Sequence, residues 1–463
     1  MTANPKTYEA YKLMHSGILA FARAEQQGIR VDTNYAENKK FHLTRKIDRL
    51  QTKLEQTNFY RRWAHITKTK PNINSNPQLA HYLYDVKKLE PARLTDSGKG
   101  STDEDSLTQL NIPELNDMLE IRKLRKVRDT YLDAFVREQV DGYVHPSFNL
   151  QLVRTYRSSS DRPNFQNIPI RDKEAMQACR KALYPRPGHQ LLEVDYSGLE
   201  VRIIACYSQD PNLIRYTNNL ASDIHADMAK QIFKLLNLNK SLPKHKTLRD
   251  AAKNGFIFPE FYGDYYKNCA KNLAYKWGEL SQGRWKEGQG IKISEVYLSD
   301  HLISKGINSY KQFENHIKDI EEDFKTNRFP DQFRWQNRWW KAYQKCGYID
   351  MKTGFRCSDL MNKKQVSNTP IQGSAFHCLL WSFIRVDEIM REEKWNTRLI
   401  GQIHDSIILD VHPSELHHVA KIVRRVTCEE LPKAWSWIIV PLSVDMELAD
   451  VDKSWAEKEE FLC

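Results

Sequence analysis

Two β-rich stretches that lie about 200 residues apart constrain the fold of this 463-residue chain most. The first, residues 191–197, is an apolar run that delivers Asp195 near its end, and the second, residues 399–411, has two apolar runs around His404-Asp405-Ser406. Such runs are typical of a strand and of a β-hairpin whose tip carries the polar residues. The sequence therefore predicts one sheet built from both stretches, with a helical subdomain inserted between them.

Length and charge narrow the class of protein. A chain of 463 residues is too long for one compact core and fits two or three subdomains around a cleft. Lys and Arg number 70 against 59 Asp and Glu, a net charge of +11 that favours a polyanionic partner such as nucleic acid. The first residues lack a signal-peptide pattern, and no apolar run reaches about 18 residues. We therefore expect a cytoplasmic protein with no membrane partner.

The sequence predicts mainly helices in the remaining regions. Apolar residues recur at helical spacing from about residue 8 to 58, with an interruption at 26–32, and again from about 106 to 140. Turn-forming residues concentrate between 68 and 101 and predict irregular connections there. Loops and short β-type runs are expected from 142 to 207, followed by helices up to the second β-rich stretch.

Cysteine and tryptophan give weaker indications. The eight Cys are scattered without a C-x-x-C pair, which predicts ordinary reduced thiols rather than a zinc site. The neighbouring Trp335, Trp339 and Trp340 could stack on bases, but packing is the more common use of such a cluster.

Asp195 and Asp405 are candidates for a metal site. Two isolated carboxylates on two strands are what two-metal phosphoryl transfer requires, because Mg²⁺ prefers oxygen ligands and takes the rest from water and substrate phosphates. Each Asp taken alone would more simply end a strand or occupy a turn.

Six motifs occur in the order that family A DNA polymerases require. Residues 195–202 resemble DYSxxELR, 404–406 resemble HDE, 223–225 match DIH, 368–373 match NxPxQG, and 155–169 resemble the primer-template segment TGRLSSSxPNLQNIP. Arg249, Lys253, Phe258 and Tyr262 resemble the family's fingers helix, and residues 28–32 and 100–102 resemble its thumb more weakly. The chain is identified by these motifs as similar to family A DNA polymerases, most of all to phage replicative enzymes.

The resemblance implies an α+β fold: a right hand with an antiparallel palm sheet, helical fingers and a helical thumb. It places the thumb at residues 1–148 with its tip at about 68–105, the palm at 149–215 and 397–463, and the fingers at 216–396. The segment from residue 264 to about 310 is longer than the corresponding segment of the family and is interpreted as an insertion. Its basic and aromatic character suggests either a DNA contact or a structural addition.

The resemblance also implies the reaction. Asp195 and Asp405 would hold two Mg²⁺ ions, for which Mn²⁺ can substitute, and Lys253 would act with them in catalysis. Arg249 and Lys253 are four residues apart, so on a helix they share a face and can meet one triphosphate, with His225 as a third donor. The alternative for this pair is an ordinary solvated helix face.

Sugar and base-pair recognition would use other motif residues. Glu200 would lie under the ribose and exclude a 2′-hydroxyl, and Phe258 and Tyr262 would pack beside the sugar and nascent base pair, although core packing is their simpler use. By resemblance, Phe at position 258 implies discrimination against dideoxynucleotides. Six polar residues would contact the primer-template minor groove, where acceptors occur at every base pair, or else make ordinary loop hydrogen bonds: Arg157, Asn164, Gln166, Asn167, Gln372 and His404.

The chain departs from the family pattern at two of these motifs. Five steps separate Lys253 from Phe258 where the family has four, and on a regular helix Ile257 would take the aromatic's place. Gly255 and Pro259 predict a bulge or kink that restores Phe258, because Pro clashes with the carbonyl four residues earlier. Ser406 replaces the family's Glu, so a third carboxylate is absent or comes from elsewhere.

The expected function is DNA-directed DNA polymerase, with primer-template DNA and dNTPs as partners. Asp103-Glu104-Asp105 is the only triplet before the palm that resembles an exonuclease motif, and it lacks a β pattern, so we expect no intrinsic proofreading. A separate 3′–5′ exonuclease subunit and a processivity factor are then expected partners, and a phage origin would place the enzyme in the host cytoplasm. The rival interpretations are a single-subunit RNA polymerase-like enzyme and a non-enzymatic nucleic-acid-binding protein.

Overall fold

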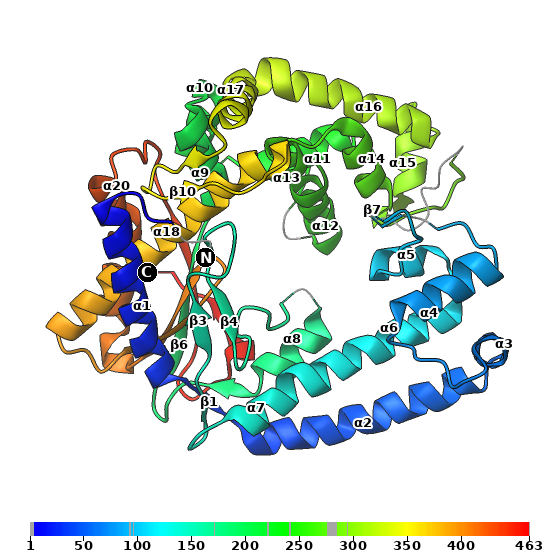
Figure 1. Ribbon diagram of the computed structural model, residues 1–463, viewed down its shortest axis with the longest axis horizontal. Helices are drawn as coiled ribbons and strands as arrows, with labels where there is room; N and C mark the ends of the chain where they lie inside the picture. The colour runs from blue at the N-terminus through cyan, green and yellow to red at the C-terminus, as the bar shows by residue number, and fades with distance from the viewer. Residues whose placement is uncertain are drawn as a thin grey trace. The chain divides into compact units, whose positions relative to one another are not determined.

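The computed structural model describes residues 4–91, 94–95, 97–170, 172–219, 222–239, 242–275, 285–293 and 295–462. The chain forms two compact units (Figure 1). Residues 1–40, 129–222 and 325–463 make the first unit, which contains the main sheet, and residues 41–128 and 223–324 make the second, which is mostly helical.

An antiparallel sheet of five strands is the centre of the first unit. Its order is β11 (Arg398–Ile403), β12 (Ser406–Val411), β6 (Gln190–Tyr196), β13 (Val444–Ala449) and β14 (Glu459–Glu460). β6 therefore lies between two strands from the C-terminal stretch, which confirms the predicted sheet.

The register gives the two faces of this sheet different chemistry. Side chains directly opposite each other in an antiparallel pair point to the same face. One face carries apolar sets, such as Val194 with Ile407 and Met446. The other face carries Asp195 with Ser406 and Asp445. Burial of the first face leaves acidic groups on the second.

Long helices cover this unit. α18 (Lys363–Glu392) packs on α1 (Tyr8–Gln27), on α9 (Leu199–Ser208) and on β12 (Figure 1). The buried Tyr196 hydroxyl makes a 2.8 Å hydrogen bond with Ser382 of α18. The helix thereby anchors β6 next to Asp195.

The remaining α-helices and strands complete the unit. The helices are α7 (Asp133–Glu138), α8 (Lys173–Arg180), α10 (Pro211–Asn218), α17 (Pro330–Cys346), α19 (Leu416–Arg425) and α20 (Leu431–Ala434). The strands are β1 (Ile29–Val31), β2 (Tyr143–Val144) and β5 (Leu183–Tyr184) in one sheet, β3 (Ser147–Asn149) with β4 (Ser159–Asp161), and β9 (Ile349–Asp350) with β10 (Arg356–Cys357).

Two helices of this unit were not expected. Residues 142–207 were predicted as loops and short strands, and this is wrong for α8 and α9. In α9 only Glu200 and Arg202 are not buried, so the helix has no polar stripe from which its period could be read. α8 begins where the Asp172 carboxylate accepts a 2.7 Å hydrogen bond from Ala175 N, a helix cap that was not predicted.

The first segment of the second unit is helical, as predicted. It contains most of α2 (Thr33–Glu55), then α3 (Asn58–Thr67), α5 (Glu104–Gln109) and α6 (Pro113–Arg125). The prediction of irregular structure over 68–101 is wrong for α4 (Asn76–Ala80) and the π-helix His81–Val86 that continues it. Ser75 caps α4, and Pro77 is tolerated because it lies in the first turn.

The second segment of this unit carries the motif helices. These are α11 (Ile224–Ile232), α12 (Pro243–Ala252), the π-helix Lys253–Ile257 and α13 (Phe258–Phe261). They are followed by α14 (Tyr266–Tyr275), β7 (Lys292–Ile293), β8 (Val296–Tyr297), α15 (Leu298–Ser304) and α16 (Tyr310–Asp323). The π-helical turn confirms the predicted bulge.

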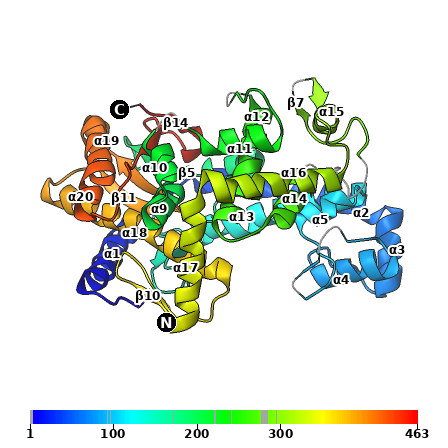
Figure 2. The same cartoon turned by 90° about the horizontal axis from the view of Figure 1, so that it is seen from above.

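Part of the 264–310 insertion packs against the motif helices. α14 and α16 lie side by side (Figures 1 and 2). His301 of α15 lies 3.0 Å, through Nε2, from the Phe233 carbonyl at the end of α11. The described residues thus have a structural use; residues 276–284 lie outside the described part, and the DNA contact stays a prediction.

The described cysteines and two of the three clustered tryptophans agree with the predictions from the sequence. All cysteines in the described part of the chain are free. Trp335 and Trp339 pack around Tyr207, with ring centres 5.9 and 6.0 Å from it, so packing is confirmed for these two residues. No helix among the described residues has both the length and the apolar character needed to span a membrane.

Candidate active site

A tight hairpin places Asp405 beside Asp195. His404 and Asp405 form the turn between β11 and β12, and His404 has a φ of 50°. The Tyr196 amide donates a 3.2 Å hydrogen bond to the Asp405 carbonyl. The hairpin tip therefore lies at the end of β6, where Asp195 is exposed.

Asp445 adds a third carboxylate that the sequence did not identify. It lies on β13 opposite Asp195, while Ser406 of β12 lies opposite Asp195 on the other side. Asp445 and Asp195 thus share the acidic face, and Asp445 takes up the negative charge that Ser406 lacks. Only strand register brings Asp445 here, and register cannot be read from one strand's sequence.

Charge crowding changes the acidity of this site. The protein around Asp195 removes part of its hydration, and the carboxylates of Asp405, Glu193 and Asp445 repel its negative form. Together these effects raise the pKa of Asp195 to about 7, although Lys458 opposes them. A divalent cation would relieve this repulsion.

The donor set fits Mg²⁺ better than a closed protein-only metal site. Within the described ranges, no three His, Cys, Asp or Glu side chains form a group that could hold a metal ion. Mg²⁺ commonly takes one or two carboxylates and completes its shell with water and substrate phosphates. Asp195 and Asp405 meet that requirement.

A buried ion-pair network surrounds Glu193, which lies on the same face of the sheet as Asp195. Glu193, two residues before Asp195, accepts a 2.9 Å hydrogen bond from Trp455 Nε1 and pairs with Lys458 Nζ at 2.5 Å. Arg180, 1% exposed, lies 4.1 Å over the Trp455 ring. The C-terminal segment is thereby fixed to β6, a role that no local motif indicated.

Gln402 connects the predicted primer-template residues to the hairpin. Gln166 Nε2 donates hydrogen bonds to Ser158 Oγ at 2.6 Å and to Gln402 Oε1 at 2.7 Å. Gln402 Nε2 donates in turn to the His404 carbonyl. Gln402 is 1% exposed and was missed because an isolated Gln within a strand carries no sequence signal.

The other predicted primer-template residues have mixed surroundings. Arg157 forms an ion pair with Glu200 in the first turn of α9. Asn164 Oδ1 accepts a 3.0 Å hydrogen bond from the Asn167 backbone amide. These two groups therefore stabilise the local turn.

Gln372 lies on α18 close to the segment that carries these residues. A Cβ added to the neighbouring Gly373 would lie 2.8 Å from the Thr155 carbonyl. Glycine is therefore required for α18 to approach this backbone so closely.

The second unit brings together the five residues of the motif helices that were predicted to bind the nucleotide: His225, Arg249, Lys253, Phe258 and Tyr262. Asp223 caps α11 by accepting hydrogen bonds from the amides of His225 and Ala226, both at 3.1 Å. The same carboxylate accepts a 2.8 Å hydrogen bond from Arg249 Nε. This double use of Asp223 fixes α12 against the start of α11.

The π-helical turn decides which side chain joins Lys253. Phe258 stacks on Tyr262 with ring centres 5.8 Å apart and planes 8° apart, and the His225 ring centre lies 5.9 Å from that of Phe258. Lys253 Nζ lies 5.6 Å from the Phe258 ring centre. Ile257 is fully buried instead.

Known proteins similar to this chain identify the family to which these motifs belong. A family model described as DNA polymerase family A matches residues 40–457. The chain belongs to DNA polymerase family A. Its sheet is the palm of this family, and its fold class is the predicted α+β right hand with helical fingers and thumb.

Family A relatives match almost the whole chain. DNA polymerase I of Chloroflexus aurantiacus is 27% identical over 477 residues, which cover 99% of this chain and 44% of that protein. DNA polymerase I of Geobacillus stearothermophilus is 27% identical over 447 residues, covering 93% and 44%. The chain thus spans less than half the length of these relatives.

A solved structure supports the fold. The POL domain of Pol1 from M. smegmatis, in complex with DNA primer-template and dNTP, has a TM-score of 0.72 and 24% sequence identity. The match covers 96% of this chain and 70% of that one. The boundaries predicted between thumb, palm and fingers, and the roles of the site residues, stay predictions.

Proposed function

We propose that this chain is a DNA-directed DNA polymerase that adds dNTPs to a primer 3′-hydroxyl. The observation that carries the proposal is the position of Asp405 beside Asp195, produced by pairing strands from two distant segments. Carboxylates at the open end of a sheet, next to a polar primer-template segment, suit metal-assisted phosphoryl transfer.

Asp195 and Asp405 would hold the metal ions. Bound Mg²⁺ would supply charge neutralisation for the triphosphate and would lower the pKa of the primer 3′-hydroxyl. Asp445, which faces Asp195 across the sheet, would add negative charge on the same face and strengthen the attraction for cations. Gln402 holds the hairpin tip that carries Asp405 through its hydrogen bond to the His404 carbonyl.

The fingers residues would bind the incoming nucleotide. Arg249, oriented by Asp223, and Lys253 present two cations to the triphosphate, with His225 beside them. Lys253 would also stabilise the charge that develops on the leaving pyrophosphate. The Phe258–Tyr262 stack would pack against the sugar and the nascent base pair.

Glu200 would select deoxyribose by occupying the space that a 2′-hydroxyl needs. Its ion pair with Arg157 holds the carboxylate at the start of α9. Arg157 and Gln166 would then test the minor-groove edge of the primer-template, where acceptors are common to all base pairs. Asn164, Asn167, Gln372 and His404 complete the proposed primer-template surface.

The biological setting belongs to the same proposal. We place the enzyme in phage replication, with a separate 3′–5′ exonuclease and a processivity factor as partners. The Asp103-Glu104-Asp105 triplet supports the absence of a nuclease site at this position, because Asp103 caps α5 by accepting a 2.8 Å hydrogen bond from Ser106 N.

Primer extension tests the proposal. The purified chain is mixed with a labelled DNA primer on a DNA template, Mg²⁺ and either dNTPs or NTPs. Template-directed extension with dNTPs alone is expected. Efficient use of NTPs would favour the RNA polymerase-like alternative. DNA binding without any extension, by a chain shown to be folded, would favour the non-enzymatic one.

A further inference from the structure

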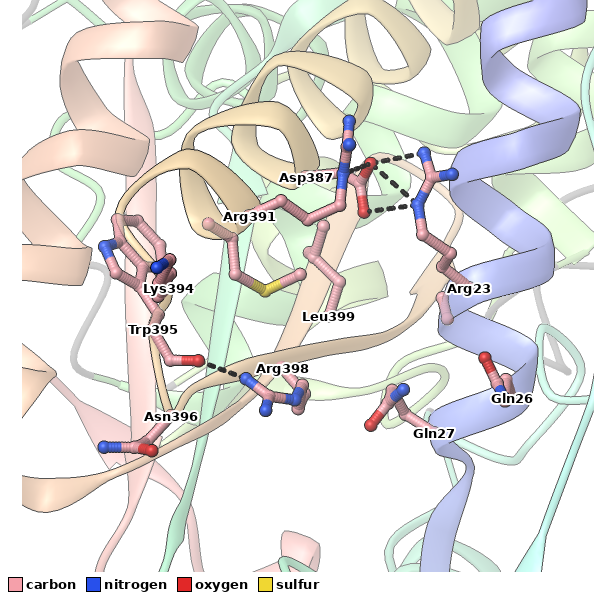
Figure 3. Close-up of a pocket in the computed structure, with 12 residues that line it drawn as sticks. Arg23, Gln26, Gln27, Asp387, Arg391, Lys394, Trp395, Asn396, Arg398 and Leu399 are labelled. Carbon is pink, nitrogen blue, oxygen red and sulfur yellow. Dashed lines mark hydrogen bonds and ion pairs between the residues drawn. The ribbon is translucent and has the colours of Figure 1, made fainter.

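A basic pocket of about 340 Å³ lies in the sheet-bearing unit (Figure 3). Its lining includes Arg398 and Leu399 at the start of β11, the end of that strand opposite the His404–Asp405 turn. The ends of α1 and α18 and the loop leading into β11 form its walls. Four cationic side chains line it: Arg23, Arg391, Lys394 and Arg398. Gln26, Gln27 and Asn396 add amide groups to the lining.

The carboxylate of the pocket is already neutralised. Asp387 is the one acidic side chain among the described residues that line it, and it is 1% exposed. Arg23 binds it through Nε at 3.0 Å and through its terminal nitrogen at 2.5 Å, and Arg391 Nε donates to it at 3.2 Å (Figure 3). Two guanidinium groups therefore share one buried carboxylate.

Lys394 and Arg398 add positive charge without a direct ion pair to any described acidic residue. In the part of the chain that the structure describes, neither has a carboxylate within 4.0 Å. Arg398 donates to the carbonyls of Trp395 and Thr397 (Figure 3 shows the first). Burial and, to a smaller extent, the nearby Arg186 guanidinium lower the pKa of Arg398, while the carboxylates of Glu415 and Asp410 oppose this shift.

The acids beyond the rim are engaged elsewhere. The Glu415 carboxylate accepts hydrogen bonds from Asn396 N at 2.9 Å and from Thr397 N and Oγ1 at 2.8 and 2.7 Å. Asp410 pairs with Arg186 at 3.2 Å and with His189 at 2.8 Å. Among the described residues, these two carboxylates therefore act on Arg398 only at longer range and form no direct ion pair with the cations that line the pocket.

We propose that this pocket binds a compact phosphate-bearing anion. Guanidinium groups match phosphate oxygens in pairs, and the amides supply further neutral donors. The volume lies in the range of small-ligand sites. The C-terminal ends of α1 and α18 oppose an anion with about −0.5 charge each, which is less than the +3 net charge of the lining side chains. The proposal does not depend on polymerase activity.

Calorimetric titration with inorganic pyrophosphate in magnesium-free buffer tests it. The parent for this titration is the Lys253→Gln variant, because Lys253 is the proposed pyrophosphate contact of the fingers. This parent is expected to show one saturable site, and adding Lys394→Gln/Arg398→Gln should weaken it by about tenfold or more. The matched control, Lys421→Gln/Arg424→Gln, removes the same charges from exposed positions of α19 in the same unit. Equal weakening in both variants, or no binding to the parent, would overturn the proposal.

Further titrations distinguish a free pyrophosphate from the phosphate chain of a nucleotide as the ligand of the pocket. Titration with dATP in the Lys253→Gln background asks whether a nucleotide's phosphate chain enters the same pocket, since Lys253 is the competing cation in the fingers. Binding of either ligand that depends on Lys394 and Arg398 supports the proposal. Binding only of a short Asp/Glu peptide would assign the pocket to a protein partner and overturn it. If the double variant unfolds, Lys394→Gln alone serves, because Lys394 is exposed in a loop.

Discussion

The Lys253 ammonium lies over the Phe258 ring, although the two residues are five positions apart. On a regular α-helix, with 3.6 residues per turn, five steps would place them on different faces. The Phe258 amide instead bonds the Lys253 carbonyl, five residues back, which is the hydrogen bond of a π-helix. The inserted residue is absorbed in one turn, and the order of functional side chains along the helix face is kept.

This geometry predicts the effect of Phe258→Tyr. A hydroxyl added at this ring would offer a hydrogen bond in place of the one lost with the nucleotide's 3′-hydroxyl. Incorporation of ddNTPs relative to dNTPs should rise by about tenfold, or roughly 1.4 kcal/mol. Single-nucleotide incorporation kinetics measure the ratio. Ile257→Val is the control and should leave it unchanged; equal use of ddNTPs and dNTPs by the parent would contradict the assignment of Phe258.

Glu200→Ala should admit ribonucleotides. Removing the side chain opens space for a 2′-hydroxyl, so NTP incorporation relative to dNTP should rise by about tenfold or more. Glu200→Gln keeps the size of the side chain and should keep most of the discrimination. Competition between one NTP and its dNTP on a defined template measures both variants. An unchanged ratio in Glu200→Ala would remove Glu200 from sugar selection.

Asp445→Asn tests the third carboxylate. Because Asp445 faces Asp195 across β6 and β13, loss of its charge should weaken the attraction for cations by roughly 1 kcal/mol. The Mg²⁺ concentration for half-maximal extension should rise about fivefold, while the rate at saturating Mg²⁺ changes little. Asp450→Asn, at an exposed position just after β13, is the matched control. Identical Mg²⁺ curves for Asp445→Asn and the parent would show that Asp445 has no part in metal binding.

The ion pairs of Asp350 should make the free energy of unfolding depend on pH in the acid range. Hydrogen bonds from Arg356, which outweigh the effect of burial, and one from Lys6 lower its pKa to about 2. A depressed pKa means that the stabilisation is complete above the ordinary value of 3.8 and is lost as pH falls through about 2. Since 37% of the Asp350 side chain is exposed, its contribution should be under about 1 kcal/mol.

Denaturant unfolding from pH 5 to pH 2 measures this contribution. The difference in unfolding free energy between the parent and Asp350→Asn should shrink as the pH falls from about 4 to about 2. A difference that stays constant over this range would show that Asp350 is not stabilised by these ion pairs.

Local patterns in the sequence account for the parts of the site that were foreseen. The apolar runs around His404-Asp405-Ser406 predicted the hairpin, and Gly255 with Pro259 predicted the helical bulge. Asp445, Gln402 and Glu193 were not foreseen, because their importance comes from strand register and from contacts between distant segments. α9 was missed for a related reason: a helix buried on nearly all sides has no polar face to reveal its period.

The most direct test of the account is metal-dependent primer extension by Asp405→Asn. This change keeps the size of the side chain and removes the negative charge of one proposed metal-binding carboxylate. We predict a loss of about a thousandfold or more in single-turnover rate, roughly 4 kcal/mol, with DNA binding and thermal stability retained and with Asp450→Asn equal to the parent. Extension by Asp405→Asn at a rate close to that of the parent would contradict the assignment of Asp195 and Asp405 as the catalytic pair.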